Sequence, residues 1–333
     1  MNISIFMAVW CQNLWDELIL KNEINSLREK YKDFSPQFQV FTYDIKNIFY
    51  LAWDIEYFEY FPINIKNPKN IFRNLKNLFN FLFVIKKSDL VVFGGWGIFF
   101  DSEVGNATNP LNQWFYRAKI AKFFRKKLMT YAVSLEVKRE ESTEKIQKIF
   151  SLVDEAFVRD EKSQNYLANL WIQSEIISDP VFWDNGKTPE ENQKISYLQE
   201  SIKTSDFQVS DIYKYNFENK IVWLALRSGF LKDEEVMIKN IVNFITQSWW
   251  KVIFLPHSFH LTDETANDKV FLEKFLVQNA FLKKNMLEVY EVYQKKHIDF
   301  CISMRLHSMI LSQVYEIPFV SLQYSQKTEI FTK

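Results

Sequence analysis

The chain has 333 residues, of which 47% are hydrophobic and 25% charged, and 41 basic residues balance 41 acidic ones. This composition is typical of a soluble globular protein of about two domains. The zero net charge gives no indication of a nucleic-acid partner, and two isolated cysteines, Cys11 and Cys301, do not support a disulfide framework or a structural zinc site.

No stretch reaches the ~18–20 uninterrupted apolar residues of a membrane span. The N-terminal segment MNISIFMAVW lacks a basic region and a small-residue cleavage site, so we expect a first strand there rather than a signal peptide. We therefore expect a cytoplasmic protein with at most peripheral contact at the inner face of the membrane.

The first half of the chain alternates short β-type runs with helical patterns. We predict strands at residues 3–9, 38–43, 90–93, 128–133, 156–158 and 176–177. Helices are predicted at residues 15–30, 70–86, 111–126, 142–153 and 160–170. Strands that alternate with helices of this length indicate βαβ units and a parallel, doubly wound sheet.

The alternation stops at residues 183–218, which are polar and carry little periodicity, and then restarts. We predict strands at 221–226, 252–255, 300–303 and 319–322, and helices at 233–247, 269–294 and 306–315. The sequence thus predicts an α/β protein with two Rossmann-like domains, residues 1–182 and 219–333. Residues 183–218 would form the linker, and the site would lie in the cleft between the domains.

Ligands of open α/β sheets bind beyond the carboxyl ends of the strands, so the polar residues at those ends are the candidates for a site. In the first half these are Asn13, Asp16, residues 94–101 with Gly94 and Gly95, Arg159, Asp160 and Asp179. In the second half they are Arg227, Ser228, Gly229, His257, Arg305, His307, Tyr324 and Lys327.

The second-half candidates are rich in groups that can carry a positive charge: Arg227, Arg305, Lys327, His257 and His307. Arginine forks match carboxylate and phosphate groups, so several cations at strand ends of a neutral protein favour a small polyanionic ligand. The alternative is that each arginine pairs with a nearby carboxylate.

The segment MRLHS, residues 304–308, is the sharpest candidate. It lies where a strand turns into a helix, so backbone N–H groups and the positive end of the helix face one place. His307 can there be a proton donor, a phosphate contact or a cap, and His257 is a weaker candidate.

Other chemistries have little support. The segment GGWG lacks the ending of a P-loop, and no H-E-x-x-H, G-x-S-x-G or paired C-x-x-C motif exists, so zinc and serine hydrolases are not indicated. Asp16 and Glu17 could ligate a cation, but acidic residues are also favoured in the first turn of a helix, which is the interpretation we prefer.

Glycine is unusually rare. A typical usage of about 7% predicts roughly 23 glycines, whereas the chain has 6 glycines and 10 tryptophans. Several tryptophans occupy turns or strand ends, where glycine is expected: Trp10, Trp15, Trp96, Trp223, Trp249 and Trp250. We interpret them as UGA codons, read as tryptophan here and as glycine in the source organism. The alternative is a low-glycine protein with genuine core tryptophans.

Together these stretches resemble the polysaccharide pyruvyl transferase family over nearly the whole chain. CQNLWDELIL resembles the family's N-x-G-D-E-x-I-L opening, and FGGWGIFFD resembles its G-G-G-G-x-x-x-D stretch. FVRDEKSQNYLANLW, SDPVF, VWLALR and MRLHSMILSQVYEIPFVSLQYSQK resemble later blocks. Trp15, Trp96, Trp171 and Trp223 fall on family glycines or small residues, which strengthens the recoding interpretation. The chain ends six residues after Lys327, where family members usually continue into a further helical segment.

The resemblance implies a two-domain fold like the GT-B glycosyltransferases, with an N-terminal acceptor side and a C-terminal donor side. Its implied donor is phosphoenolpyruvate, its acceptor a lipid-linked or polymeric sugar of the cell wall or cell surface, and its products a pyruvyl ketal and phosphate. It implies no cofactor and no metal.

The resemblance also implies roles for individual residues. His307 would be the general acid, Arg305 and Arg159 would hold phosphate and carboxylate, Arg227 is a third candidate clamp, and Lys327 would neutralise the leaving phosphate. Asn13, Asp16, Gly94 and Gly95 would contact substrate. Two alternatives stay open: a nucleotide-sugar glycosyltransferase on the same fold, and a non-catalytic relative that binds phosphorylated sugars.

Overall fold

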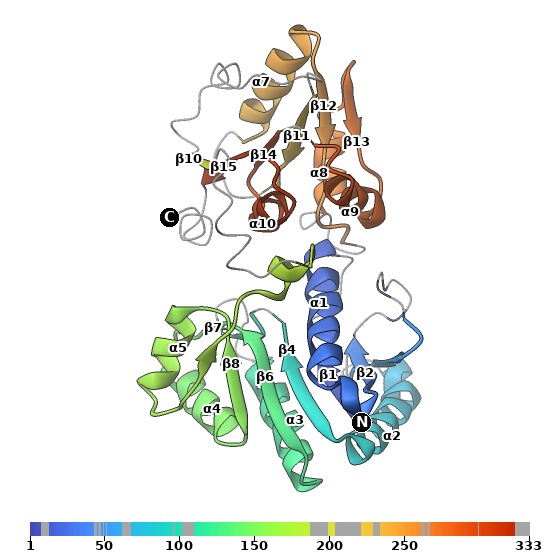
Figure 1. Cartoon of the computed structure of the whole chain (residues 1–333), viewed down its shortest axis with the longest axis vertical. Coiled ribbons are helices and arrows are strands. Elements are labelled where there is room, and N and C mark those ends of the chain that lie inside the picture. The colour runs from blue at the N-terminus through green and yellow to red at the C-terminus, as the bar shows by residue number, and fades with distance from the viewer. Residues whose placement is uncertain are drawn as a thin grey trace. The chain divides into compact units, whose positions relative to one another are not determined.

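The computed structural model describes residues 1–7, 13–42, 45, 48, 50, 52–61, 68–95, 97–101, 110–186, 199–203, 221–228, 234–260, 264, 267–298 and 300–323. The chain divides into two compact units, Met1–Trp10 with Asp16–Pro180 and Cys11–Trp15 with Val181–Lys333. Each unit is built on its own parallel sheet (Figure 1). No helix among the described residues is long and apolar enough to cross a membrane.

The sheet of the first unit has seven strands in the order β3-β2-β1-β4-β6-β8-β9, and every pairing is parallel. The strands are β1 (Asn2–Phe6), β2 (Gln37–Thr42), β3 (Ile55–Glu59), β4 (Leu90–Gly94), β6 (Lys127–Val133), β8 (Glu155–Val158) and β9 (Glu175–Ile176). A separate two-stranded sheet pairs β5 (Phe99–Phe100) with β7 (Leu135–Glu136). The order of the large sheet is that of a doubly wound fold.

The described residues of this half of the chain form the α-helices α1 (Leu14–Lys30), α2 (Ile71–Lys87), α3 (Pro110–Phe123), α4 (Glu140–Phe150) and α5 (Glu161–Ala168). Short 3₁₀ turns are η1 (Lys32–Phe34), η3 (Pro68–Asn70) and η4 (Pro180–Trp183). α1 begins where the Asn13 carboxamide oxygen accepts from the Trp15 amide at 3.1 Å, and its first turn is acidic and its last turn basic. Both features stabilise a helix through its unpaired ends and its dipole.

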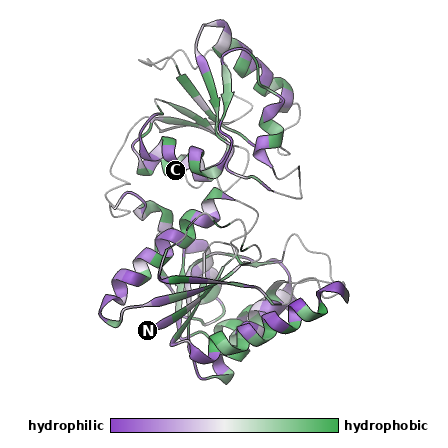
Figure 2. Cartoon of the chain, turned by 90° about the vertical axis from the view of Figure 1, so that its right-hand side faces the viewer, coloured by the Kyte–Doolittle hydropathy of each residue, from purple (hydrophilic) through white to green (hydrophobic). Residues whose placement is uncertain are grey.

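The core of the first unit is aromatic. Phe6 and Phe41 stack with ring centroids 4.3 Å apart, and Phe81 of α2 meets both rings edge-on at 5.8 Å. Val84 and Ile85 complete the buried face of α2. The central strands β4 and β6 are accordingly mostly apolar (Figure 2), as parallel strands covered on both faces are.

The sheet of the second unit has six parallel strands in the order β10-β15-β14-β11-β12-β13. They are β10 (Gln199–Lys203), β11 (Ile221–Ala225), β12 (Lys251–Phe254), β13 (Ala280–Leu282), β14 (Cys301–Ser303) and β15 (Phe319–Gln323). Its helices are α7 (Glu234–Gln247), α8 (Asp268–Glu273), α9 (Met286–Gln294) and α10 (Leu306–Val314).

The single helix predicted at 269–294 is wrong. That segment forms α8, the strand β13 and α9. Asn279 adopts φ +67°, which a helix does not allow, and the run after it pairs with β12 at the edge of the sheet. The apolar residues of α8 and α9 both follow a helical spacing, so the sequence alone does not distinguish two short helices from one long helix.

The predicted linker, residues 183–218, contains a strand. β10 pairs in parallel with β15, so this part of the segment belongs to the second sheet. Most of the remaining linker residues lie outside the described part of the chain, as do Trp10, Trp96, Tyr324 and Lys327.

Two tryptophans adopt backbone angles that favour glycine. Trp171, after α5, has φ +61°, and Trp249, after α7, has φ +63°. Their side chains are 95% and 84% exposed, so no packing compensates the strain of the left-handed conformation.

We expect Trp171→Gly and Trp249→Gly each to stabilise the protein by about 1 kcal/mol, because glycine adopts φ > 0 without a steric penalty. Chemical denaturation monitored by circular dichroism measures the change. Trp53 is a matched control, since it is 90% exposed and has no positive φ. Equal stabilisation by Trp53→Gly would contradict the backbone explanation.

Candidate functional site

Three neighbouring strands of the second sheet bring the predicted cationic residues to one edge. β14, β11 and β12 are adjacent and parallel, so their carboxyl ends meet at the same edge. Arg305 and His307 follow β14, Arg227 follows β11, and His257 follows β12. Arg227, His257, Arg305 and His307 thus follow three adjacent strands of the second unit.

The Asp268 carboxylate ties two of these strand ends together. One oxygen accepts from the backbone N–H groups of His257 at 3.0 Å and Ser258 at 3.1 Å. The other oxygen accepts from Nη2 of Arg305 in a buried ion pair. A buried ion pair of this kind holds both side chains in place, because removal of either partner would leave an uncompensated buried charge. The Nε of Arg305 is buried and has no hydrogen-bond partner among the described residues.

His257 lies in a directed chain of hydrogen bonds. Its Nδ1 lies 2.8 Å from the Leu255 carbonyl, which can only accept, so Nδ1 carries the proton and Nε2 accepts from the Tyr293 hydroxyl at 3.2 Å. Ser308 then donates to the Tyr293 oxygen at 2.6 Å, and the Cys301 thiol lies 3.4 Å from the Ser308 oxygen.

Burial lowers the pKa of His257 to about 3, and the nearby Arg305 charge adds to this effect. His257 is therefore neutral at physiological pH, and its inclusion among the cations was wrong. Burial likewise raises the pKa of Cys301 to about 11, which makes it an inert thiol.

The turn from β14 into α10 presents backbone donors as predicted. Ser303 accepts from the Arg305 N–H at 3.0 Å and donates to the Arg305 carbonyl at 2.9 Å, which fixes the turn. Arg305 is the N-cap residue of α10, without a side-chain cap, and His307 is the second residue of the helix. The N–H groups of this first turn and the helix dipole favour an anion beside His307.

Trp15 covers one face of His307. The indole and imidazole rings stack with centroids 4.1 Å apart and planes within 6°, and Trp15 is fully buried. The start of α1 is held there by backbone pairing of Asn13 with Ser258 and by the Leu14 N–H, which donates to the His257 carbonyl at 3.1 Å. Asn13, Trp15, His257 and His307 therefore form one cluster within the second unit.

In the first unit, Arg159 follows β8 and lies 3.3 Å from Asp179, with side chains 17% and 5% exposed. Both were predicted as strand-end candidates, and here each offsets the charge of the other. An anion that binds Arg159 would share the guanidinium with this carboxylate.

Gly94 ends β4, Gly95 follows it, and both have structural reasons to be glycine. A Cβ at Gly94 would overlap the Glu23 carboxyl, and Gly95 has φ +66°. Burial raises the pKa of Glu23 well above its usual range, and neither of its oxygens has a hydrogen-bond partner among the described residues. Loss of hydration, with the neighbouring Glu17 charge, also raises the pKa of Asp16 well above its usual range.

Sequence reasoning missed Asp268, Tyr293 and Glu23. Asp268 lies outside the strand ends, at the start of a six-residue helix, and Tyr293 and Glu23 lie on buried helix faces. No local motif distinguishes them, because their partners are distant in sequence. The role of Lys327 stays a prediction, since it lies outside the described residues.

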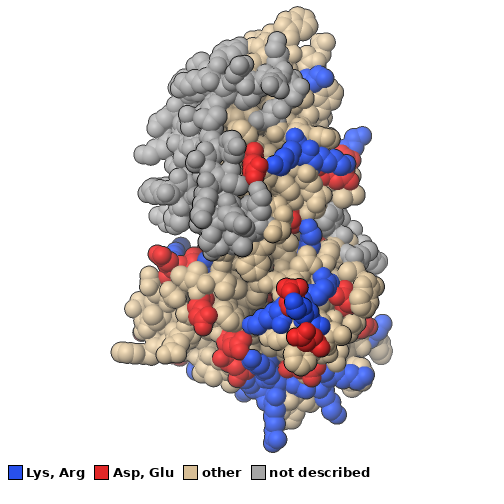
Figure 3. All heavy atoms as spheres, viewed as in Figure 1, with Lys and Arg blue, Asp and Glu red and all other residues tan. Residues whose placement is uncertain are grey.

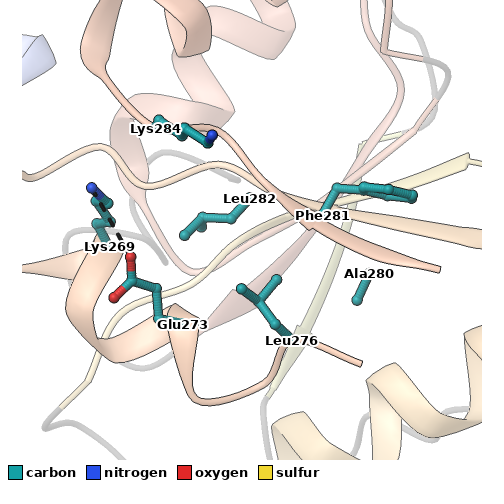
Figure 4. Close-up of a pocket in the computed structure, with 7 residues that line it drawn as sticks. All are labelled: Lys269, Glu273, Leu276, Ala280, Phe281, Leu282 and Lys284. Carbon is teal, nitrogen blue, oxygen red and sulfur yellow. Dashed lines mark ion pairs between the residues drawn. The ribbon is translucent and has the colours of Figure 1, made fainter. Parts of the chain in front are cut away.

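A pocket of about 370 Å³ lies between α8 and β13 (Figure 4). Its lining is Lys269, Glu273, Leu276, Ala280, Phe281, Leu282 and Lys284. Lys269 and Glu273 pair with each other at 4.0 Å. None of the predicted site residues lines it.

The sequence model of the polysaccharide pyruvyl transferase family matches residues 16–326. The chain belongs to this family. Its members are transferases that pyruvylate polysaccharides, and the match runs through Arg159, Arg227, Arg305 and His307. No curated protein is significantly similar to the chain in sequence.

Solved structures are similar in fold. A putative UDP-N-acetylglucosamine 2-epimerase from Listeria monocytogenes has a TM-score of 0.57 at 10% identity, over 99% of this chain and 81% of that one. The UDP-GlcNAc 2-epimerase from Neisseria meningitidis bound to UDP-GlcNAc has a TM-score of 0.53 at 14% identity, over 99% of this chain and 85% of that one. A glycosyltransferase from Rickettsia africae has a TM-score of 0.52 at 14% identity, over 97% of this chain and 80% of that one. These similarities show a GT-B-like fold of two Rossmann-like domains.

We expect Glu23→Gln to stabilise the protein at pH 8 and to have little effect at pH 4. The raised pKa of Glu23 means that the folded state holds a proton which the unfolded state releases above about pH 4.3. The free energy of unfolding therefore falls as the pH rises above about 4.3. Glutamine has no proton to release, so the variant avoids this loss. Urea denaturation at both pH values tests this, and a variant with the same pH dependence as the parent would contradict it.

Proposed function

We propose that the protein transfers pyruvate from phosphoenolpyruvate to a sugar of a cell-wall or surface polysaccharide, as a ketal, with release of phosphate. The observation that carries the proposal is the cluster at the carboxyl ends of β14, β11 and β12, where His307 and Arg305 adjoin the N-terminus of α10. Membership of the pyruvyl transferase family supports it.

Phosphoenolpyruvate bears a phosphate and a carboxylate on one small frame, so it requires at least two groups of donors. The first-turn amides of α10 and the Nε of Arg305 would take one anionic group. Arg227 and Lys327 are the candidates for the other, with Arg159 as a clamp shared with Asp179. The acceptor is proposed to be a lipid-linked or polymeric sugar.

In the proposed reaction, protonated His307 gives its proton to the methylene carbon, which becomes the methyl group. Two sugar hydroxyls form two C–O bonds to the adjacent carbon, and the bond from that carbon to the phosphate oxygen breaks. One hydroxyl proton restores His307, and the other leaves with phosphate. Cations beside the leaving group stabilise its developing charge.

We further propose that glycine stands at Trp15, Trp171 and Trp249 in the native protein, through UGA codons read as glycine; Trp10, Trp96, Trp223 and Trp250 are further candidates. The positive φ values at Trp171 and Trp249 support this. Trp15 supports it differently, since its buried indole fills the space directly against the His307 ring at the candidate site.

Mass spectrometry of peptides from the native source organism tests the recoding. We expect the mass of glycine at positions 171 and 249 and that of tryptophan at Trp114, which packs edge-on against Phe93 and Phe99 in the core. Tryptophan at positions 171 and 249 would contradict it.

We expect Trp15→Gly to raise phosphate release from phosphoenolpyruvate in the presence of amino-sugar acceptors, because it removes a large ring from the space beside His307, where substrate could then lie. His307→Ala in that background should lower turnover by about a hundredfold or more, as expected for a general acid. Trp171→Gly is the matched control, since it removes an exposed tryptophan without changing the surroundings of His307. Unchanged turnover in His307→Ala would remove His307 from the acid role, and transfer from a nucleotide sugar instead would favour the glycosyltransferase.

A further inference from the structure

Helix α2 exposes a row of large apolar side chains. Phe72 is 86% exposed, Phe79 69% and Phe83 58%, with Leu75 between them at 47%. Their spacing of three, four and four residues places them on one stripe of the helix. The opposite face, including Phe81 and Val84, is buried in the core, so the stripe is a second apolar face on a helix that is already packed (Figure 2).

The stripe is bordered by lysines and lacks acidic residues. Helix α2 contains no Asp or Glu. On the helical projection Lys76 and Lys87 fall on one side of the phenylalanines and Lys86 on the other. None of these three lies within ion-pair distance of a carboxylate in the described part of the chain, and the Lys87 ammonium lies 4.1 Å from the Phe83 ring centre.

The end of α3 extends this surface. α2 contacts α3, and the two helices lead into the adjacent strands β4 and β6, so both end at the same edge of the sheet. Phe123, at the end of α3, is 80% exposed, and Arg125 and Lys126 follow it. Lys and Arg side chains gather at this end of the first unit (Figure 3).

We propose that this surface, the exposed face of α2 with the end of α3, binds an anionic phospholipid bilayer. Exposed aromatic side chains bordered by lysine are the pattern of a helix that lies in the membrane interface. No helix among the described residues could span a membrane, and the buried face of α2 keeps the helix attached to its own sheet. The protein therefore lies on the bilayer through one face.

Charge favours a bilayer over a second copy of the chain. In a two-fold symmetric dimer the same patch meets itself, so the lysines that border one stripe would face the same lysines on the other. Anionic headgroups instead complement them, at a gain of roughly fivefold in affinity for each basic residue near the surface.

Flotation of the full chain with vesicles tests the proposal without any substrate, so its outcome is independent of the proposed pyruvyl transfer. The vesicles are phosphatidylcholine alone or mixed with phosphatidylglycerol. We expect binding to the mixed vesicles at least about tenfold tighter than to the neutral ones, and weaker at high salt.

Two variants separate the apolar and ionic contributions. Phe79→Ser with Phe83→Ser should lower binding to both vesicles by about tenfold or more, whereas Lys86→Gln with Lys87→Gln should lower binding to the mixed vesicles by about tenfold or more and leave binding to the neutral ones unchanged. Phe34→Ser is the control, since Phe34 is 65% exposed in the same unit but lies in η1. Thermal unfolding of each variant confirms that the fold is intact.

Three results would overturn the proposal. The first is absence of binding to mixed vesicles, and the second is binding that the phenylalanine variant leaves unchanged. The third is a dimer, seen by analytical ultracentrifugation, that Phe79→Ser with Phe83→Ser dissociates while vesicles bind neither protein; this would assign the surface to a second copy of the chain.

Discussion

The buried carboxylate of Asp268 organises the candidate site. It holds the backbone after β12 through two N–H groups and the side chain of Arg305 after β14 through an ion pair. A carboxylate removed from water is stable only when its oxygens are satisfied, and here both are. These contacts offset the loss of hydration of the carboxylate. They also fix the backbone around His257 and orient Arg305 relative to the first turn of α10.

The ionisable groups of this cluster divide into two kinds. One kind is a hydrogen-bonded chain that ends at a backbone carbonyl and consists of His257, Tyr293, Ser308 and Cys301. Burial keeps the histidine of this chain neutral and its thiol protonated. All four of these side chains are buried, so they support the turn from β14 into α10 from inside the fold. Arg305 and His307, the other kind, belong to that turn and to the first turn of α10.

Three tryptophans occupy positions where a smaller residue would fit better, two because of the backbone and one because of packing. At Trp171 and Trp249 the chain adopts φ values that a side chain disfavours, and at Trp15 a large ring occupies the space against His307. Trp114, by contrast, is surrounded by aromatic rings in the core and has the contacts expected of a genuine tryptophan. The exposed stripe of α2 shows the same contrast for phenylalanine, because Phe81 fills the core whereas Phe72 and Phe79 meet solvent.

The sequence by itself determined the α/β class, most strand and helix positions, and the placement of Arg227, Arg305 and His307 at strand ends, because periodicity and strand-to-helix turns are local properties of the chain. Only the tertiary structure decided which strands are neighbours, and hence that the ends of β14, β11 and β12 meet. It also showed that residues 269–294 include an edge strand and that Asp268 pairs with Arg305. It placed the Glu23 carboxyl against Gly94, without a hydrogen-bond partner among the described residues. Those features depend on contacts between residues far apart in the chain, and on burial, which shifts the pKa of a side chain without any signature in the neighbouring residues.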